Sequence, residues 1–125
     1  MIRTRIAAAF GAAVLAGLGI AATATPASAA YSQCDSGALC AYLYDSGVGT
    51  PGQVFGNNTN LEQYDKFNNA ESVYNNGNSC DVHIYNQQNY GGTVGLLKRG
   101  YAIHDLDSES GGTWADDIAS NYWVC

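Results

Sequence analysis

The chain has 125 residues, and its five Lys and Arg against eleven Asp and Glu give a formal net charge of −6. Nucleic acid and anionic membranes are poor partners for such an acidic surface, so binding of either is not expected. Metal cations and basic protein surfaces suit this charge better.

The first 29 residues have the organisation of a secretory signal peptide. Arg3 and Arg5 form a positive start, residues 7–23 are rich in Ala, Gly, Leu and Val, and residues 27–29 are the small residues of a cleavage site. The sequence therefore predicts a secreted, extracellular protein of residues 30–125, with an uncleaved membrane anchor as the alternative. No second apolar run is long enough to cross a membrane.

Residues 30–125 are enough for one domain, and their three cations and eleven acids give a net charge of −8. All four cysteines lie in this part, and an even count in a small secreted domain predicts two disulfides. Of the three possible pairings, we predict Cys34 with Cys40 across a local turn, and Cys80 with Cys125 across a long loop. A zinc site is the alternative, but neither a Cys-x2-Cys spacing nor a paired His motif supports it.

Short runs rich in Tyr, Val and Ile alternate with Asn and Gly clusters, and no segment keeps the period of an amphipathic helix. This pattern predicts an all-β domain. The expected strands are residues 39–44, 82–85, 93–97, 101–106 and 121–124.

One stretch combines a folded turn with a set of oxygen donors. Tyr85 ends an alternating strand, polar residues turn the chain, and Tyr90 is followed by a glycine pair that tolerates backbone angles other residues resist. Further along, Asp116, Asp117 and Ser120 place two carboxylates close to a hydroxyl. Hard cations such as calcium prefer oxygen ligands of this kind.

The chain repeats this pattern in a weaker form. Residues 41–44 match 82–85, and residues 68–74 match 116–122, with a Tyr two residues after the Ser in each copy. The sequence therefore predicts two Greek keys, about 34–77 and 78–125, packed as a sandwich. In the first copy no second aromatic follows Tyr44, and Gly52 is the candidate for the motif glycine.

Together the two motifs resemble the βγ-crystallin Greek key, in which an aromatic-x4-aromatic-x-Gly hairpin precedes an Asx-Asx-x-x-Ser/Thr-Ser calcium motif. The resemblance implies a βγ-crystallin-like sandwich that takes calcium as its only cofactor. The calcium ligands that it implies are Asn68, Asn69, Ser72, Asp116, Asp117 and Ser120. The sixth motif position, where the family prefers Ser, is Val73 in one copy and Asn121 in the other. The alternative is that these side chains only complete turns through backbone hydrogen bonds.

The chain is also similar to a family of secreted actinobacterial metalloprotease inhibitors with a βγ-crystallin-like fold. The similarity rests on the signal peptide, the Cys34 and Cys40 pair, the turn at 89–92, and the strand and turn from 93 to 100. It implies that the partner is an extracellular zinc metalloprotease of the thermolysin type. An enzyme is not expected, because the sequence marks no strained nucleophile turn and the four cysteines are predicted to be paired. In that family the inhibitory loop is an elaborated hairpin of the second half with its own disulfide. Here the hairpin is short and has no flanking cysteine.

Two loops are candidates for contact with a protease. One contains Val54 and Phe55 between glycines, which offers the bulky apolar residue that thermolysin-like enzymes favour just after the bond they cut. The alternative for this pair is a buried strand of the first Greek key. The other candidate is the short hairpin of Asn86, Gln87, Gln88, Asn89 and Tyr90.

Two other functions stay open for a protein with this sequence. One is a calcium-binding structural module of the crystallin type. The other is a killer-toxin-like or cell-wall-binding protein whose tyrosines stack on sugars, although most tyrosines of such a domain belong to its core and sheets. A monomer is expected.

Overall fold

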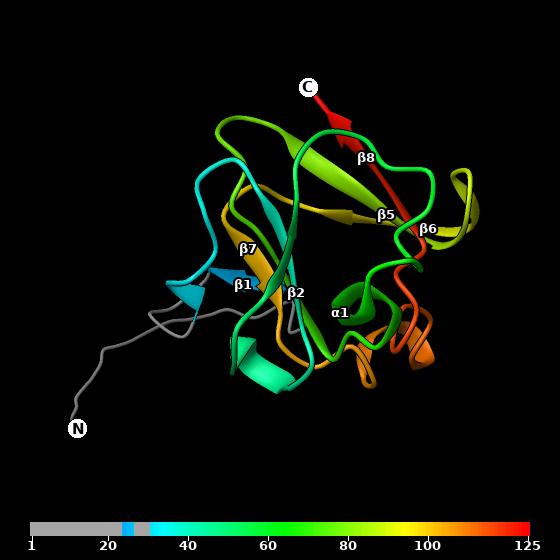
Figure 1. Cartoon of the computed structure of the whole chain (residues 1–125), viewed down its shortest axis with the longest axis horizontal. Coiled ribbons are helices and arrows are strands. Elements are labelled where there is room, and N and C mark those ends of the chain that lie inside the picture. Colours follow the sequence, from blue (N-terminus) through cyan, green and yellow to red (C-terminus); the bar gives the residue numbers. More distant parts are fainter. Residues whose placement is uncertain (1–23, 27–30) are drawn as a thin grey trace.

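The computed structural model describes residues 24–26 and 31–125, so the predicted signal peptide lies outside the described residues except for 24–26. Two antiparallel sheets face each other across the core (Figure 1). The first has the strand order β1-β7-β4-β2-β3, and the second has the order β6-β5-β8. The predicted all-β class and the sandwich of two Greek keys are confirmed.

The strands are β1 (Ala24–Pro26), β2 (Leu39–Tyr42), β3 (Gly52–Val54), β4 (Ser72–Asn75), β5 (Asp81–Gln87), β6 (Gly91–Leu97), β7 (Tyr101–Ile103) and β8 (Ser120–Val124). The helical turns are η2 (Asp45–Gly47), α1 (Asp65–Asn68) and η3 (Glu109–Gly111). All five predicted strands are present, with β2 and β7 ending earlier than expected. The sequence did not reveal β4 and α1, because a pattern cannot repeat within four residues, and it indicated β3 only as the alternative for Val54 and Phe55. Among the described residues, no helix has the length and apolarity needed to cross a bilayer.

The two halves exchange strands. In the first sheet, β2, β3 and β4 of the first half are joined by β7 of the second half. In the second sheet, β5, β6 and β8 of the second half are joined by Asn58 of the first half, which makes an isolated bridge to Asn121. The halves are therefore interlocked and do not merely stack.

The core lies between the two sheets. In β5 the side chains of Val82 and Ile84 are fully buried, as the two-residue alternation of a strand requires. Each buried Leu, Ile, Val or Phe contributes about 1.5–3 kcal/mol. The buried partners of Val82 and Ile84 include Leu39, Ala41, Val54, Leu61, Phe67, Ala70, Val73, Leu97, Ile103, Leu106, Trp114 and Ile118.

The second hairpin, between β5 and β6, folds back over its own sheet. Tyr90 has a positive φ of 62°, and its ring lies 5.6 Å from Tyr85 and 5.4 Å from Tyr122 between ring centres. Ser120 fixes the turn, because its Oγ donates to Gln87 O at 2.7 Å and accepts from Tyr90 N at 3.0 Å. The hairpin predicted from the sequence thus has the expected form.

The first hairpin, between β2 and β3, is fixed in the same way. Ser72 Oγ donates to Tyr44 O at 2.7 Å and accepts from Gly47 N at 3.0 Å. Gly47 therefore occupies the place of Tyr90, with a similar φ of 69°.

These contacts correct the predicted alignment of the two halves. The counterpart of Tyr85-x4-Tyr90-x-Gly92 is Tyr42-x4-Gly47-x-Gly49. The predicted match of Tyr44 with Tyr85 is wrong by two residues, and Gly52 begins β3 instead of serving as the motif glycine. The error arose because the aromatic residue that marks the motif is a glycine in the first copy.

The ring that Gly47 lacks is supplied by Tyr31. This side chain is 2% exposed, and its ring centre lies 5.3 Å from that of Tyr42 and 5.2 Å from that of Tyr74. A Cβ atom on Gly47 would collide with the Tyr31 ring, so the glycine makes room for it. The Tyr31 hydroxyl also pairs with Nδ1 of His104 at 2.7 Å. Burial raises the pKa of Tyr31 to about 12, which keeps this hydroxyl protonated.

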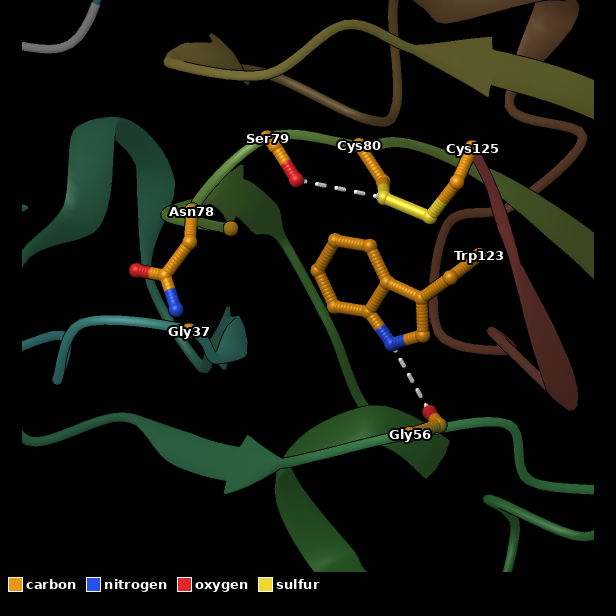
Figure 2. A pocket seen from close by; sticks show the side chains of 8 residues that line it. Gly37, Gly56, Asn78, Ser79, Cys80, Trp123 and Cys125 are labelled. Carbon is orange, nitrogen blue, oxygen red and sulfur yellow. Dashed lines mark hydrogen bonds between the residues drawn. A yellow bond between two sulfur atoms is a disulfide. The ribbon is translucent and has the colours of Figure 1, made fainter.

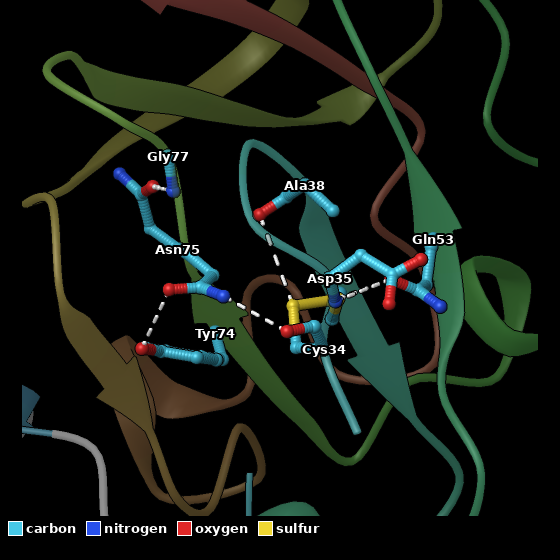
Figure 3. The surroundings of a disulfide bond; sticks show 9 residues. Cys34, Asp35, Ala38, Gln53, Tyr74, Asn75 and Gly77 are labelled. Carbon is cyan, nitrogen blue, oxygen red and sulfur yellow. Dashed lines mark hydrogen bonds between the residues drawn. A yellow bond between two sulfur atoms is a disulfide. The ribbon is translucent and has the colours of Figure 1, made fainter. Parts of the chain in front are cut away.

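The two disulfides pair as predicted. Cys34 joins Cys40 with a Cα–Cα distance of 5.9 Å, and Cys80 joins Cys125 at 4.7 Å. The first closes the turn that leads into β2, where the backbone N–H of Asp35 donates to the side chain of Gln53 at 2.7 Å (Figure 3). The second ties the start of β5 to the end of β8.

Candidate functional site

The chain leaves β3 with an exposed aromatic residue. Val54 pairs with Leu39 and is 8% exposed, so its side chain belongs to the core. Phe55 follows with 59% of its side chain exposed, and Gly56 then turns the chain with a φ of 70°. The buried-strand alternative therefore holds for Val54, and only Phe55 of this pair reaches the surface.

The loop after Phe55 is fixed by hydrogen bonds, most of them from residues of β8. Gly56 O accepts hydrogen bonds from Trp123 Nε1 at 2.9 Å (Figure 2) and from the side-chain nitrogens of Asn58 and Asn121, each at 3.1 Å. One residue further along, Asn57 Oδ1 accepts from Trp123 N at 2.7 Å. Because the loop is already ordered, a partner that binds it loses little conformational entropy.

The hairpin at 86–90 presents amide side chains to solvent and not its tyrosine. Residues 87–89 are exposed, whereas Tyr90 is half-buried against Tyr85 and Tyr122. Asn86 Oδ1 accepts from Thr93 N at 2.8 Å and so belongs to the turn itself. This hairpin offers no apolar side chain to a peptidase pocket.

The two candidate loops are in contact with each other. Asn89 N in the hairpin donates to Thr59 O in the loop after Phe55 at 2.9 Å. Nearby, Gln88 Nε2 donates to Glu62 Oε1 at 2.7 Å. A partner seated on one loop would therefore lie close to the other.

Three of the six predicted calcium ligands, Ser72, Ser120 and Asn69, complete turns in this structure. Ser72 and Ser120 are fully buried, and each hydroxyl has one backbone donor and one backbone acceptor in its hairpin. Asn69 Nδ2 donates to the backbone oxygen and to Oδ1 of Asp65, both at 3.0 Å, and Asn68 is exposed beside it. A calcium role for these four residues stays a prediction.

The connection between β7 and β8 brings Asp116 against the first half. Trp114 is buried in this connection, and its Nε1 donates to Thr93 O at 3.1 Å. Two residues later, Asp116 adopts a left-handed φ of 59° and donates its N–H to Ala70 O at 2.9 Å. Aspartate tolerates this conformation better than most residues.

Asp116 belongs to a group of three carboxylates. Oxygen atoms of Asp116, Glu71 and Asp107 lie within 4.8 Å of one another. Burial, with hydrogen bonds to Asp116 and Asp107, raises the pKa of Glu71 to about 8, so Glu71 carries a proton at neutral pH. Carboxylate oxygens are the ligands that calcium prefers, and a bound cation would take the place of that proton.

Asp117 forms a separate carboxylate pair with Glu62. Burial and the hydrogen bond with Glu62 raise the pKa of Asp117 to about 6. The same hydrogen bond, together with the one from Gln88, lowers the pKa of Glu62. Glu62, Glu71 and Asp107 were not predicted as partners, because they come from segments that only the fold brings together.

The profile of peptidase inhibitor family I36 matches residues 27–97, which is more than half of the chain. The chain belongs to peptidase inhibitor family I36. Both candidate loops of this I36 protein lie within the matched residues, whereas Asp107, Asp116 and Asp117 lie beyond them. No curated protein sequence matches the chain.

Solved structures similar to this I36 protein are βγ-crystallin domains. A βγ-crystallin domain studied for the evolution of the eye-lens fold matches with a TM-score of 0.61 and 19% identity, over 85% of this chain and 93% of that one. IPSE/alpha-1 from Schistosoma mansoni eggs matches with a TM-score of 0.59 and 17% identity, over 73% and 88%. A βγ-crystallin from an archaeon matches with a TM-score of 0.52 and 20% identity, over 72% and 100%. At these identities the likeness shows the fold alone.

Proposed function

We propose that this I36 protein is a secreted inhibitor of thermolysin-like zinc peptidases, and that it presents Phe55 to the peptidase. The observation that carries the proposal is a large apolar side chain, 59% exposed, on a loop pinned by hydrogen bonds to β8. Membership of an inhibitor family makes an extracellular peptidase the expected partner and points away from an enzyme.

The loop suits the way such a peptidase binds a substrate. Thermolysin-like enzymes favour a bulky apolar residue just after the bond they cut, and Phe55 would fill that pocket. The chain on either side is fixed, by pairing of Val54 with Leu39 before it and by the bonds to Gly56 O after it. A fixed loop resists the movement that would carry it through cleavage, so the complex would persist.

Inhibition assays on single variants test this proposal. The wild-type protein should inhibit thermolysin at micromolar concentration or better and leave trypsin untouched. Phe55→Ala should weaken inhibition by about 30-fold, which corresponds to the 2 kcal/mol of a typical hot-spot side chain.

Tyr44→Ala is the matched control, because Tyr44 is another aromatic residue and is 62% exposed. This variant should inhibit as the wild type does. Full inhibition by Phe55→Ala would mean that another surface, with the 86–90 hairpin as the next candidate, contacts the peptidase. Absence of inhibition in a folded, oxidised sample would contradict the inhibitor function itself.

A second candidate function is calcium binding, and it is favoured by the carboxylate group of Glu71, Asp107 and Asp116. Three close carboxylates repel one another unless a proton or a cation lies among them. A calcium ion held by these residues would supply that charge and link the β7–β8 connection to the first half.

Thermal unfolding at pH 8 with calcium and with a chelator tests this second candidate. Extracellular modules bind calcium at about 0.1–1 mM, so about 10 mM calcium should raise the melting temperature by several degrees. Asp116→Asn should remove most of that rise, while Asp35→Asn, an equal change of charge at an exposed site, should keep it. An unchanged melting temperature in calcium would mean that the three carboxylates bind a proton and not calcium.

A further inference from the structure

A hollow of about 250 Å³ lies where the two halves meet, beside the loop of Phe55 (Figure 2). Trp123, Asn78, Ser79 and the Cys80–Cys125 disulfide come from the second half, and Gly37, Gly56 and Gly77 of the first half complete the lining. Neither the inhibitory loop nor the carboxylate group includes Trp123, Asn78 or Ser79. The volume is below the usual range of about 300–1,000 Å³ for pockets of drug-sized ligands, so it suits one small ring.

The indole of Trp123 is held in a fixed position in this hollow. Figure 2 shows it between the disulfide and Gly56, with its six-membered ring on the side of Asn78. A Cβ atom on Gly77 would lie 2.6 Å from this ring, so only a glycine at position 77 leaves room for the ring in this orientation. The bond from Nε1 to Gly56 O fixes its rotation. The result is a rigid aromatic surface at a site whose rim is exposed to solvent.

The polar side chains of the hollow are oriented and uncharged. Asn78 Oδ1 accepts from Ser36 Oγ at 2.7 Å, which leaves the Asn78 Nδ2 group on the side of Gly37. Within residues 31–125 this Nδ2 has no hydrogen-bond acceptor, and the hydroxyl of Ser79 has only the sulfur of Cys80 within hydrogen-bond distance, at 3.6 Å. No Asp, Glu, Lys or Arg of the described chain lines the hollow.

These features select the chemistry of a ligand. Without side-chain carboxylates the hollow offers a cation only the face of Trp123, and without Lys or Arg in a domain of net charge −8 it has no charged group to hold an anion. A purely apolar ligand would leave the amide and hydroxyl donors unpaired. A neutral ring with one apolar face and several oxygen atoms satisfies all of these groups.

We propose that the hollow binds one residue of a neutral saccharide. The C–H face of the sugar ring packs on Trp123, and a hydroxyl or acetamido oxygen accepts a hydrogen bond from Asn78 Nδ2. Ser79 Oγ lies on the same rim and completes the contacts to ring substituents. For a single sugar residue, whose contacts are few, a dissociation constant of about 1 mM is expected.

Nuclear magnetic resonance titration of the ¹⁵N-labelled protein tests the proposal. The probes are tetra-N-acetylchitotetraose, cellotetraose and maltotetraose, each added to about 10 mM so that a 1 mM site is saturated. At least one should shift the Trp123 Nε1–H and Asn78 side-chain signals and leave the Nε1–H of buried Trp114 in place.

Asn78→Asp is the sharpest variant, since a carboxylate still accepts from Ser36 Oγ but lacks the N–H donor. It should weaken binding about tenfold, the effect of one lost hydrogen bond at 1.4 kcal/mol. Ser79→Ala should also weaken it. Asn60→Asp makes the same chemical change outside the hollow, at a residue whose Oδ1 accepts from Glu62 N, and should bind as the wild type does.

Two results would overturn the proposal. One is the absence of any shift at these signals with all three saccharides. The other is equal binding by wild type and Asn78→Asp. If the signals move only when a peptidase is added, the hollow belongs to a protein interface and the saccharide assignment is wrong.

Discussion

In the second half of the molecule, the ring that covers the hairpin is Tyr90, a residue of the hairpin itself. In the first half the same place is filled by Tyr31, which precedes the hairpin, while Gly47 stands where Tyr90 stands in the other copy. The serine that ties each turn, Ser72 or Ser120, is the same in both. The two copies therefore share a tyrosine ring that packs over the hairpin and a serine hydroxyl that is hydrogen-bonded to the turn. The position in the sequence of the tyrosine that supplies this ring differs between the two copies.

The largest expected effect on stability comes from removing the ring of Tyr31, which lies outside the hairpin that it covers. Tyr31→Ala should lower the free energy of unfolding by about 3–5 kcal/mol, because it empties a fully buried aromatic site. Tyr90→Ala should cost about half as much, since Tyr90 is only half-buried. Urea unfolding of both variants measures the difference. Equal losses would mean that the two rings are equivalent and that burial does not separate the halves.

The comparison can be sharpened by moving the ring. Gly47→Tyr alone should destabilise the protein, because its side chain would collide with Tyr31. In the double variant Tyr31→Ala with Gly47→Tyr, the new ring should occupy the vacated place, since Gly47 already has the left-handed φ that Tyr90 adopts. The double variant should recover about 1–2 kcal/mol relative to the sum of the single changes. Additive losses would show that the first hairpin cannot accept a ring from its own turn.

A smaller and equal effect is expected from the two serines. Ser72→Ala and Ser120→Ala each leave a buried or partly buried backbone N–H and C=O without their side-chain partner, which costs about 1–3 kcal/mol. Ser79→Ala, at an exposed hydroxyl, should have little effect on unfolding. A large loss in only one of the two buried variants would show that the two turns are held differently.

The smallest effect is a dependence of stability on pH. Glu71 has a pKa of about 8 in the folded protein and an ordinary value of 4.5, so between these values the folded state binds more protons than the unfolded state. Stability should therefore fall as the pH rises from 5 to 8, and the pKa of about 6 for Asp117 acts in the same direction. The melting temperature should drop by a few degrees across this window. Glu71→Gln should flatten the curve, whereas an unchanged slope in this variant would place the responsible group elsewhere.

The sequence was sufficient for the fold class and for the hairpin of the second half, because the signals of that half are local. Alternation in 82–85, the tyrosine and glycine spacing after it, and the cysteine positions each report on contacts made within a short stretch or a disulfide. The hairpin of the first half was not recognised because its ring comes from Tyr31, which is distant in sequence from Gly47, the residue at the equivalent position of the turn. The spacing of Tyr42, Gly47 and Gly49 carries the only local trace of the motif.

The candidate site was predicted in part. Phe55 was identified by chemistry, as a bulky residue between glycines, but its exposure depends on Val54 turning inward in β3. The cluster of three carboxylates was missed because Glu71 and Asp107 come close to each other only when the β7–β8 connection folds onto the first half. The hollow at Trp123 was missed for the same reason, since glycines from three separate segments make room for it.

The exchange of strands between the halves has a consequence for resistance to digestion. β7 lies in the first sheet and Asn58 bridges to the second, so neither half can detach while the other stays intact. An opening that exposes the paired strands to a peptidase active site would have to break pairing in both sheets. Cleavage then follows the population of the fully unfolded state, which is small for a stable domain. A protein with this architecture can remain beside a peptidase far longer than one whose halves open separately.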